Sequence, residues 1–424
     1  MSSDIPPPPI PQRAEVLVVG AGPGGSAAAA HAATAGHDVV LLDAATFPRD
    51  KTCGDGLTPR AVAELDHLGL GRFLDDRPRL DGLALHGWGA SQQIRWPSGR
   101  FPTFGSAVSR VELDEEIRAL AVARGAQMVQ GAKAVDVTMR DGRIAEVVVD
   151  TSDGARSIAV RNVIVADGVR SGLGKALGRE WHRETAYGVA ARAYVKSGRA
   201  DDNWMGSHLE LRGPDGALLP GYGWVFPLGG AGDGLLNVGV GALATAKRPA
   251  HMALRPILEH YTRMVGDEWA IEGPPQRLTS ALLPMGGAVT GVAGPNWMLI
   301  GDAAALVNPL NGEGIDYALE AGRLAVELLD ETRGSPDHTT RWRDVLIGQY
   351  GLAFSAARRL AGLLTVPQAV PTLGRPGMRS THLMSMVVRV MGNLITPDDA
   401  DLVARAWRTA GRLSSQIDDR PPFR

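Results

Sequence analysis

Apolar residues near the N-terminus form short unbroken runs that are separated by a helical pattern. Residues 16–19 and 38–42 are such runs, and an alanine-rich helix is expected between them, over residues 26–35. Unbroken apolar runs of this length are typical of strands that are buried on both faces of a sheet. The order strand, helix, strand therefore predicts a βαβ unit with a parallel sheet.

The same pattern predicts further strands and helices of this sheet. The apolar runs at 162–166 and 297–300 each indicate a short buried strand, and an acidic residue follows closely after each. The pair Asp141-Gly142 predicts a two-residue turn between strands at 134–139 and 144–149. The remaining expected elements of this region are a strand at 128–130 and helices at 109–124 and 312–329.

A second region has the turn residues and short strands of an antiparallel sheet. Its expected strands lie within 83–104 and at 187–195, 208–212, 223–227 and 235–242, followed by a helix at 249–265. Segments of the two regions alternate along the chain. We therefore expect an α/β fold in which a Rossmann-like domain is interleaved with an antiparallel β-sheet domain and followed by a C-terminal helical region. The expected ranges are 1–13 for a disordered tail, 14–85, 107–180 and 277–330 for the Rossmann-like domain, 86–106 and 181–276 for the β-sheet domain, and 331–424 for the helical region.

The composition is that of a globular protein without general affinity for nucleic acid. The 424 residues are 44% hydrophobic and 21% charged, with a formal net charge of −2. No apolar run reaches the roughly eighteen residues of a transmembrane helix, and the proline-rich start lacks the features of a signal peptide. The single cysteine, Cys53, excludes an internal disulfide and fits a reducing compartment. The histidines show no metal-ligand spacing, so no metal is expected.

The turn after the first strand has the spacing G-x-G-x-x-G that binds a dinucleotide. Gly20 permits the tight turn, and Gly22, next to Pro23, lets the backbone approach a pyrophosphate at the positive end of the helix. Gly25 lets the helix pack closely on the strand. Asp43 ends the second apolar run, where a carboxylate accepts hydrogen bonds from ribose hydroxyls. The alternative is an ordinary glycine-rich turn in an α/β sheet.

Three later motifs place acids and glycines at the ends of buried strands. They are Asp167-Gly168, Gly301-Asp302, and the turn 309–315 with Gly312, Gly314 and Ile315. A carboxylate at the carboxyl end of a strand lies where open α/β sheets bind ligands. Glycines at a helix start can bring bare N–H groups against an anionic ring edge.

Together with the N-terminal motif, this set resembles the FAD-dependent oxidoreductases built like para-hydroxybenzoate hydroxylase, and it implies FAD as the cofactor. By that resemblance Asp302 holds the ribityl chain. The backbone of Gly312, Gly314 and Ile315 would meet the pyrimidine edge of the flavin. Arg110, in a Ser-Arg-x-x-Leu-Asp segment that opens a helix, matches an arginine that contacts FAD.

Two further segments narrow the resemblance. Residues 47–60 and residues 220–227, which read P-G-Y-G-W-V-F-P, are similar to the geranylgeranyl reductase family, whose flavoenzymes saturate double bonds in prenyl chains. Over almost the whole chain, including 181–185 and 420–423, the sequence is similar to the actinobacterial members that reduce one isoprene double bond of the menaquinone tail. The resemblance implies a polyprenyl quinone as substrate and places Cys53 near the flavin.

In a strand, Tyr222, Trp224 and Phe226 point to one face. Such a row of rings would form a wall for an apolar chain that reaches the flavin. The alternative is a core stripe between sheet and helix. For Cys53 the alternative is likewise a small buried hydrophobe.

An isoprene double bond has no carbonyl to accept negative charge, so we expect hydride transfer to one carbon and proton delivery to the other. Positive character on the more substituted carbon would be stabilised by the ring faces of Trp224 and Tyr222, by about 1–2 kcal/mol when desolvated. Tyr222, Cys53 and Asp55 are the candidate acids, and the sequence does not choose among them. It also leaves open whether NADH, NADPH or a protein donor is the reductant.

A quinone with a long tail stays in the membrane, so we expect a cytoplasmic protein attached peripherally to the inner face of the cell membrane. Residues 383–395 form a wide apolar arc on a helical wheel, and Arg375 and Arg379 precede it. The alternative is that this helix docks on the catalytic domain.

Two other classes of protein share some of these motifs. One is a flavin monooxygenase or halogenase, and the other is a prenyl-binding protein of the GDP-dissociation-inhibitor kind. The oligomeric state stays open.

Overall fold

The N-terminal βαβ unit folds as the apolar pattern predicts. A computed structural model describes residues 10–250, 253–333, 337–366 and 368–424. In it β1 (Arg13–Val19) leads through the glycine turn into α1 (Pro23–Thr34), and β2 (Val39–Leu42) pairs in parallel with β1. The disordered tail that was expected over 1–13 lies outside the described residues as far as position 9, and β1 already begins at Arg13.

Eight strands form the larger sheet, which has a parallel centre. The order is β18-β19-β10-β1-β2-β7, and β9 and β8 extend it from the first half of β10 in antiparallel pairing. Asp141 and Gly142 have φ angles of 52° and 74°, as the predicted two-residue hairpin requires. β10 is longer than the expected 162–166 because its first half pairs with β9 and its second half with β1. The bounds are β7 (Gln127–Val129), β8 (Lys133–Arg140), β9 (Arg143–Thr151), β10 (Gly154–Val165), β18 (Ala293–Gly294) and β19 (Trp297–Leu299).

Helices cover this sheet, and two of them approach each other closely. A Cβ at Gly24 of α1 would lie 2.9 Å from the carbonyl oxygen of Ala318, and a Cβ at Gly322 would lie 2.7 Å from that of Gly24. Only glycine at both points allows α1 and α6 to pack at this distance. The helices are α2 (Pro59–His67), α3 (Arg110–Ala123), α4 (Gly172–Ala176), α6 (Ile315–Glu331) and α7 (His338–Leu346).

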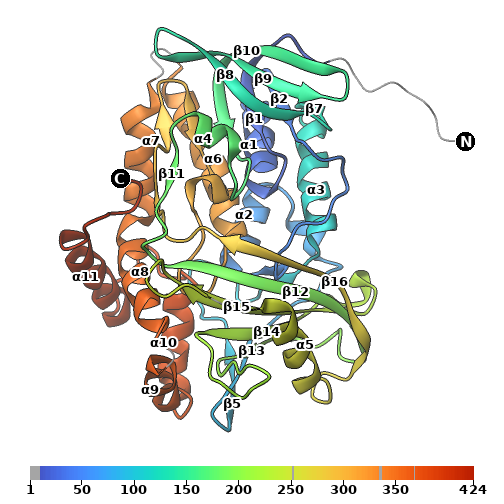
Figure 1. Cartoon of the computed structure of the whole chain (residues 1–424), viewed down its shortest axis with the longest axis vertical. Coiled ribbons are helices and arrows are strands. Elements are labelled where there is room, and N and C mark those ends of the chain that lie inside the picture. Colours follow the sequence, from blue (N-terminus) through green and yellow to red (C-terminus); the bar gives the residue numbers. More distant parts are fainter. Residues whose placement is uncertain (1–9, 251–252, 334–336, 367) are drawn as a thin grey trace, which may run out of the picture.

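A seven-stranded sheet lies below the first in Figure 1, with the order β16-β12-β15-β14-β13-β4-β5. All its pairs are antiparallel except β13 with β4. α5 (Leu254–Met264) covers one face of it. The strands are β4 (Gly82–Gly87), β5 (Ala90–Arg95), β12 (Tyr187–Ser197), β13 (Trp204–His208), β14 (Gly221–Pro227), β15 (Leu235–Ala244) and β16 (Ile271–Leu283). Two short pairs complete the sheets: β3 (Gly56–Leu57) with β6 (Ser106–Ala107), and β11 (Glu180–Trp181) with β17 (Val289–Thr290).

The structure corrects several expected elements. The strand expected at 208–212 is wrong, because β13 ends at His208 and residues 211–219 form a turn. β16 was not expected, since Gly273-Pro274-Pro275 reads as a loop. Prolines are tolerated there because β16 is the edge strand of the sheet. The helices expected at 249–265 and 312–329 begin later, at Leu254 and Ile315.

The C-terminal helices lie beside the seven-stranded sheet, at the lower left of Figure 1. They are α8 (Leu352–Leu364), α9 (Ala369–Gly377), α10 (Thr381–Met391) and α11 (Leu402–Gln416), and a short π-helical segment (Ile347–Gly351) precedes α8. Met384 and Val388 of α10 are buried in one cluster with Leu85 and Met205 of the seven-stranded sheet. The expected docking of α10 is therefore confirmed. The helix ends at Met391 rather than reaching 395, and Leu383 remains 39% exposed. Among the described residues no helix is long and apolar enough to cross a membrane.

Candidate active site

The glycine turn after β1 has one crowded side and one open side. Gly20 has a φ of 103°, and a Cβ there would lie 2.3 Å from the carbonyl oxygen of Ala166. A Cβ at Gly25 would lie 1.8 Å from the carbonyl oxygen of Gly20. A Cβ at Gly22, in contrast, would meet nothing closer than two guanidinium nitrogens at 3.7 and 3.9 Å. The turn therefore leaves room at the N-terminus of α1, where Pro23 occupies the first helical position and lacks an N–H.

The two guanidinium groups at this opening belong to Arg49 and Arg110. Asp114, fully buried, accepts two hydrogen bonds from Arg110, of 2.6 and 2.7 Å, and lies 3.1 Å from Arg49. Asp43 also lies 3.9 Å from Arg49, so two carboxylates face the two guanidinium groups. The guanidinium N–H donors and the end of a helix dipole together fit the pyrophosphate of FAD. The sequence singled out Arg110 but not Arg49, although Arg49 lies within the 47–60 motif.

Acidic residues end the neighbouring strands, with different surroundings. Asp43 accepts hydrogen bonds from the backbone N–H of Ala21 (2.7 Å) and of Ala45 (2.8 Å), which hold its carboxylate beside the glycine turn. The carboxylate of Asp302 makes no hydrogen bond or ion pair within the part of the chain that the structure describes. Asp167 instead accepts from the Ser171 hydroxyl (2.6 Å) and from the N–H of Leu173 (3.0 Å) at the start of α4. Its cofactor role stays a prediction, and its visible role is to cap α4.

The loop before α6 lies next to Asp302. Gly301 begins the turn that contains Asp302, and a Cβ at Gly314 would lie 3.7 Å from Oδ1 of Asp302. Gly312 has a φ of 77°, and Ile315 is the first residue of α6. The fold thus brings the free carboxylate and the glycine loop together at the end of β19. Their roles toward the ribityl chain and the pyrimidine edge of the flavin stay predictions.

Tyr222, Trp224 and Phe226 share one face of β14, as predicted. Their neighbouring ring centroids are 6.0 and 6.3 Å apart. On the other face, a Cβ at Gly223 would lie 2.3 Å from the ring of Tyr261 in α5. The rings therefore face away from α5, toward the Rossmann-like domain.

This row of rings joins two loops that lie far apart in the sequence. The Tyr222 hydroxyl donates to the carbonyl oxygen of Asn311, next to the glycine loop. At the other end, a Cβ at Gly54 would lie 3.3 Å from the Trp224 indole nitrogen, and one at Gly56 would lie 2.9 Å from the Phe226 ring. The aromatic row thus connects the Cys53 loop to the loop expected at the flavin edge.

Asn237 of β15 fixes this arrangement. Its Oδ1 accepts a hydrogen bond of 2.9 Å from Nε1 of Trp224. Its Nδ2 donates to the Cys53 carbonyl (2.9 Å) and to Oδ2 of Asp55 (2.8 Å). The indole lies flat on bare backbone, because a Cβ at Gly239 would lie 2.0 Å from it. No sequence motif marks Asn237, which the pairing of β14 with β15 alone brings to the site.

Asp55 is a fully buried carboxyl group on a left-handed backbone with a φ of 62°. Besides Asn237, the Tyr194 hydroxyl donates to its Oδ2 at 2.6 Å. Its Oδ1 is buried without a hydrogen-bond partner among the described residues. Burial outweighs these hydrogen bonds and the nearby Arg192, and it raises the pKa of Asp55 to about 6. Asp55 therefore exchanges its proton near neutral pH.

The other two candidate acids hold their protons more tightly. Burial raises the pKa of the Cys53 thiol, although Arg110 and the N–H of Asp55 favour the thiolate. Burial and the charge of Glu313 raise the pKa of Tyr222. Glu313 itself, which accepts a hydrogen bond from Thr58, has a pKa raised by burial to about 7. The site is thus lined by acids whose neutral forms are favoured.

One group of potential metal ligands does occur in the described residues: His86, His208 and Glu268. It lies on the α5 side of the seven-stranded sheet, where His208 Nδ1 contacts the Tyr261 hydroxyl at 2.6 Å. The two imidazoles are stacked, 4.7 Å apart and within 17° of parallel. Nearly parallel rings cannot both direct in-plane lone pairs at one ion, whereas both can face the Glu268 carboxylate, at 3.4 and 3.6 Å. We therefore describe this group as a polar cluster rather than a metal site.

Comparison with known proteins agrees with the site. A family model described as an FAD binding domain matches residues 13–339. Menaquinone reductases of Mycobacterium tuberculosis and Mycolicibacterium smegmatis are each 59% identical to this chain, covering 97% of it and 98–99% of their own length. A digeranylgeranylglycerophospholipid reductase of Methanopyrus kandleri is 32% identical over 82% of this chain and 90% of its own length.

The chain belongs to the geranylgeranyl reductase family. It is an FAD-dependent oxidoreductase. One solved structure that matches is a geranylgeranyl bacteriochlorophyll reductase-like protein of Thermoplasma acidophilum. It superposes on this chain with a TM-score of 0.76 at 21% sequence identity, and the match covers 94% of this chain and 99% of the other. A flavin-dependent brominase reaches 0.73 at 17% identity, covering 95% and 99%. Both confirm the expected fold class, while the reductase relatives favour reduction over prenyl binding without redox chemistry.

Proposed function

We propose that this protein reduces one isoprene double bond in the tail of menaquinone. The observation that carries the proposal is the aromatic row of Tyr222, Trp224 and Phe226, which spans from the Cys53 loop to the loop before α6. A monooxygenase acting on a small aromatic acid has no need of such an extended apolar wall. The relatives at 59% identity carry the name menaquinone reductase, which supports the quinone as substrate.

Different residues would hold different parts of FAD. Gly22, Arg49 and Arg110 would hold the pyrophosphate, Asp43 and Asp302 the ribose and ribityl hydroxyls, and the backbone at Gly312, Gly314 and Ile315 the pyrimidine edge. When bound and reduced, FAD supplies the hydride for one carbon of the double bond. Asn237 and Gly239 hold Trp224 in one orientation, so its ring face is prepared before the alkene arrives.

The chain must then stabilise positive charge and deliver one proton. As a proton is delivered to the less substituted carbon, the more substituted carbon becomes positive, and the faces of Trp224 and Tyr222 stabilise it by about 1–2 kcal/mol. This positive carbon is the one that would take the hydride. We assign Asp55 as the acid that supplies the proton, because its pKa of about 6 lies nearest to neutral pH among the candidates. The proton forms the first new C–H bond with the π electrons of the double bond and leaves Asp55 as a carboxylate, which Tyr194 and Asn237 stabilise. The hydride would complete the second C–H bond.

The substrate also implies a place in the cell. A quinone tail stays in the bilayer, so the protein would bind peripherally to the inner face of the cell membrane. The exposed hydrophobic residues of the C-terminal helices, such as Leu363, Leu383 and Leu413, support this assignment.

The test is an anaerobic single turnover. Reduced holoenzyme is mixed with menaquinone in detergent, and the flavin absorbance and the product mass are followed. We expect the flavin to become oxidised while the tail gains two hydrogen atoms. Flavin that stays reduced over hours would refute the proposal. A product that gains oxygen when air is admitted would favour the monooxygenase or halogenase alternative.

A further inference from the structure

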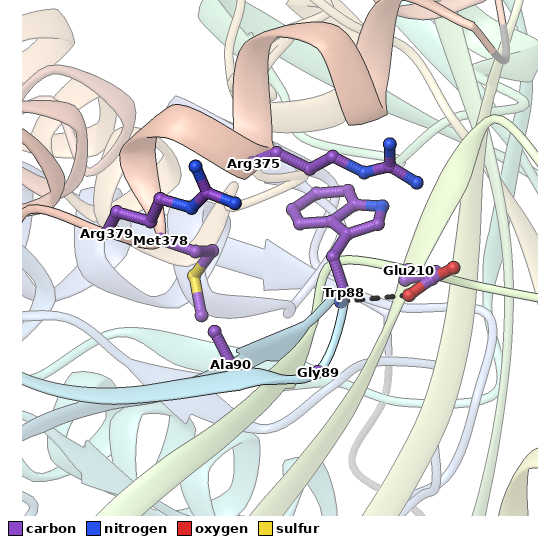
Figure 2. A pocket seen from close by; sticks show the side chains of 7 residues that line it. All are labelled: Trp88, Gly89, Ala90, Glu210, Arg375, Met378 and Arg379. Atoms are coloured by element: carbon purple, nitrogen blue, oxygen red, sulfur yellow. Dashed lines mark hydrogen bonds between the residues drawn. The ribbon is translucent and has the colours of Figure 1, made fainter.

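A pocket of about 480 Å³ lies between α9 and the hairpin of β4 and β5, away from the aromatic row. Seven residues line it: Trp88, Gly89, Ala90, Glu210, Arg375, Met378 and Arg379. Figure 2 shows Arg375 extending over the indole of Trp88, with Met378 and Arg379 on the neighbouring side. The pocket therefore combines two cations with an aromatic and thioether surface.

Its charged groups leave an excess of hydrogen-bond donors. The side chains of Arg375 and Arg379 are exposed and make no hydrogen bond or ion pair with any residue that the structure describes. Nε1 of Trp88 is buried and has no partner among the same residues. The only carboxylate, Glu210, is already engaged, since it accepts from the Trp88 backbone N–H (2.9 Å) and twice from Arg212. Unpaired donors of this kind attract an anion.

The pocket is held in place rather than formed by loose side chains. Trp88 sits at the tip of the hairpin with a φ of 51°, and its ring packs so closely on α9 that a Cβ at Gly374 would lie 2.2 Å from it. Nε2 of Gln92 donates to the carbonyl oxygen of Met378 at 2.7 Å. This bond satisfies a carbonyl at the C-terminus of α9, and it reduces the negative charge that a helix end would present to an anion.

The C-terminal helices, one of which contributes to the pocket, also expose large apolar residues. Of the eleven large hydrophobic residues that are exposed in the described chain, six belong to the C-terminal helices and their ends. They are Leu352, Leu363, Leu383, Leu402, Leu413 and Ile417. Leu383 lies four residues after Arg379, in the first turn of α10. Exposed apolar residues beside unpaired arginines are the pattern of a surface that lies on anionic lipid.

We propose that this pocket binds the phosphate of an anionic phospholipid and so seats α9 and α10 on the membrane surface. Arg375 and Arg379 would contact the phosphate oxygens, and Trp88 would donate its indole N–H. Leu383 and its neighbours would then enter the interface between headgroups and acyl chains. This inference rests on the proposed function, because a membrane-embedded quinone gives the protein a reason to reach the bilayer.

The test is flotation with vesicles of phosphatidylcholine that contain phosphatidylglycerol, at low salt. Because a basic residue near an anionic surface contributes about 1 kcal/mol, the variant Arg375→Gln/Arg379→Gln should bind about 30-fold more weakly than the parent. The control Arg255→Gln/Arg263→Gln removes two charges from α5, which covers the other face of the β-sheet, and should bind within about 3-fold of the parent. Equal binding by the parent and the pocket variant, or equal loss in the control, would overturn the proposal.

Two further arms identify the ligand and separate this inference from the proposed activity. The variant Trp88→Phe keeps a ring on α9 but removes the indole N–H donor. It should bind soluble short-chain phosphatidylglycerol more weakly in calorimetry. Unchanged binding would show that Trp88 is not part of the site. Inorganic phosphate that binds as tightly as the short-chain lipid would refute the lipid assignment. Each variant should still oxidise its flavin with detergent-solubilised menaquinone, so lost flotation with retained turnover isolates the pocket.

Discussion

Replacing Asp55 by asparagine tests the acid that we assign to alkene reduction. Asparagine has the same shape, and its amide oxygen can accept the hydrogen bonds that Tyr194 and Asn237 donate to Oδ2. The variant loses only the exchangeable proton. We expect it to retain FAD and to reduce the tail about 10²–10⁴-fold more slowly, which is the usual contribution of a positioned general acid.

The pH dependence of the reaction rate and of the stability provides a second test of the same assignment. Burial raises the pKa of Asp55 from 3.8 to about 6, a difference worth about 3 kcal/mol between the folded and the unfolded chain. The protonated acid is needed, so the rate of tail reduction should fall as pH rises, by about 50-fold between pH 6 and pH 8. The contribution of Asp55 to the free energy of unfolding also falls as pH rises. The folded chain binds this proton more tightly than the unfolded chain, so the contribution is present at low pH and is lost as pH rises through about 6. The Asp55→Asn variant should therefore gain about 1.4 kcal/mol relative to the parent between pH 5 and pH 8.

The assay is anaerobic stopped-flow oxidation of the reduced flavin by menaquinone across this pH range. Tyr194→Phe is the matched control, because it removes one hydrogen bond that favours the Asp55 carboxylate. The loss of about 1.5–3 kcal/mol should move the fall in rate upward by about one to two pH units. A fall that does not move, or an Asp55→Asn variant as fast as the parent, would refute the assignment. Loss of turnover in Cys53→Ala instead would identify the thiol as the acid.

Four further substitutions test the cofactor site and the aromatic row. Asp302→Ala should lose FAD, since its carboxylate is free to accept ribityl hydrogen bonds of about 1.5–3 kcal/mol each; stoichiometric flavin after gel filtration would contradict this. Trp224→Ala should keep FAD but lose most turnover, and a colourless protein would indicate a packing role instead. Gly22→Ala should fold and lose flavin affinity, because a Cβ fits the protein there but fills the space beside Arg49. Gly25→Ala should fail to fold, because its Cβ would lie 1.8 Å from the carbonyl oxygen of Gly20; circular dichroism and flavin content distinguish the two glycine variants.

The parts of the site that could be predicted from sequence are those with a local physical cause. The spacing of Gly20 and Gly25 reflects one turn and one packing contact, and alternation along a single strand places Tyr222 and Trp224 on one face. Asn237 could not be predicted, because its contacts depend on how β15 pairs with β14 and where the Cys53 loop lies.

The errors in the predicted fold have the same cause, because they too depend on contacts between segments that are far apart in the sequence. β16 contains a Gly-Pro-Pro sequence that locally disfavours a strand, and only its position at the sheet edge makes it acceptable. The apolar arc of 383–395 fitted either lipid or protein, and the choice depended on the hydrophobic face that the seven-stranded sheet presents. That face buries Met384 and Val388 and leaves Leu383 exposed. Periodicity gives the direction of a side chain, but not the partner that covers it.

Burial links the acid and the carbon that it protonates. The low-dielectric surroundings that raise the pKa of Asp55 and Glu313 also keep water away from the aromatic row. A positive carbon formed in contact with water would be hydrated, so dryness is as necessary for alkene reduction as the proton itself. An exposed carboxyl group would ionise well below neutral pH and could not supply that proton. Arg110 lies near both Gly22 and Cys53, and together with Arg192 it lowers the pKa of Asp55, but burial outweighs both cations. Burial thus provides both the protonated acid and the dry surroundings that reduction of the double bond would need.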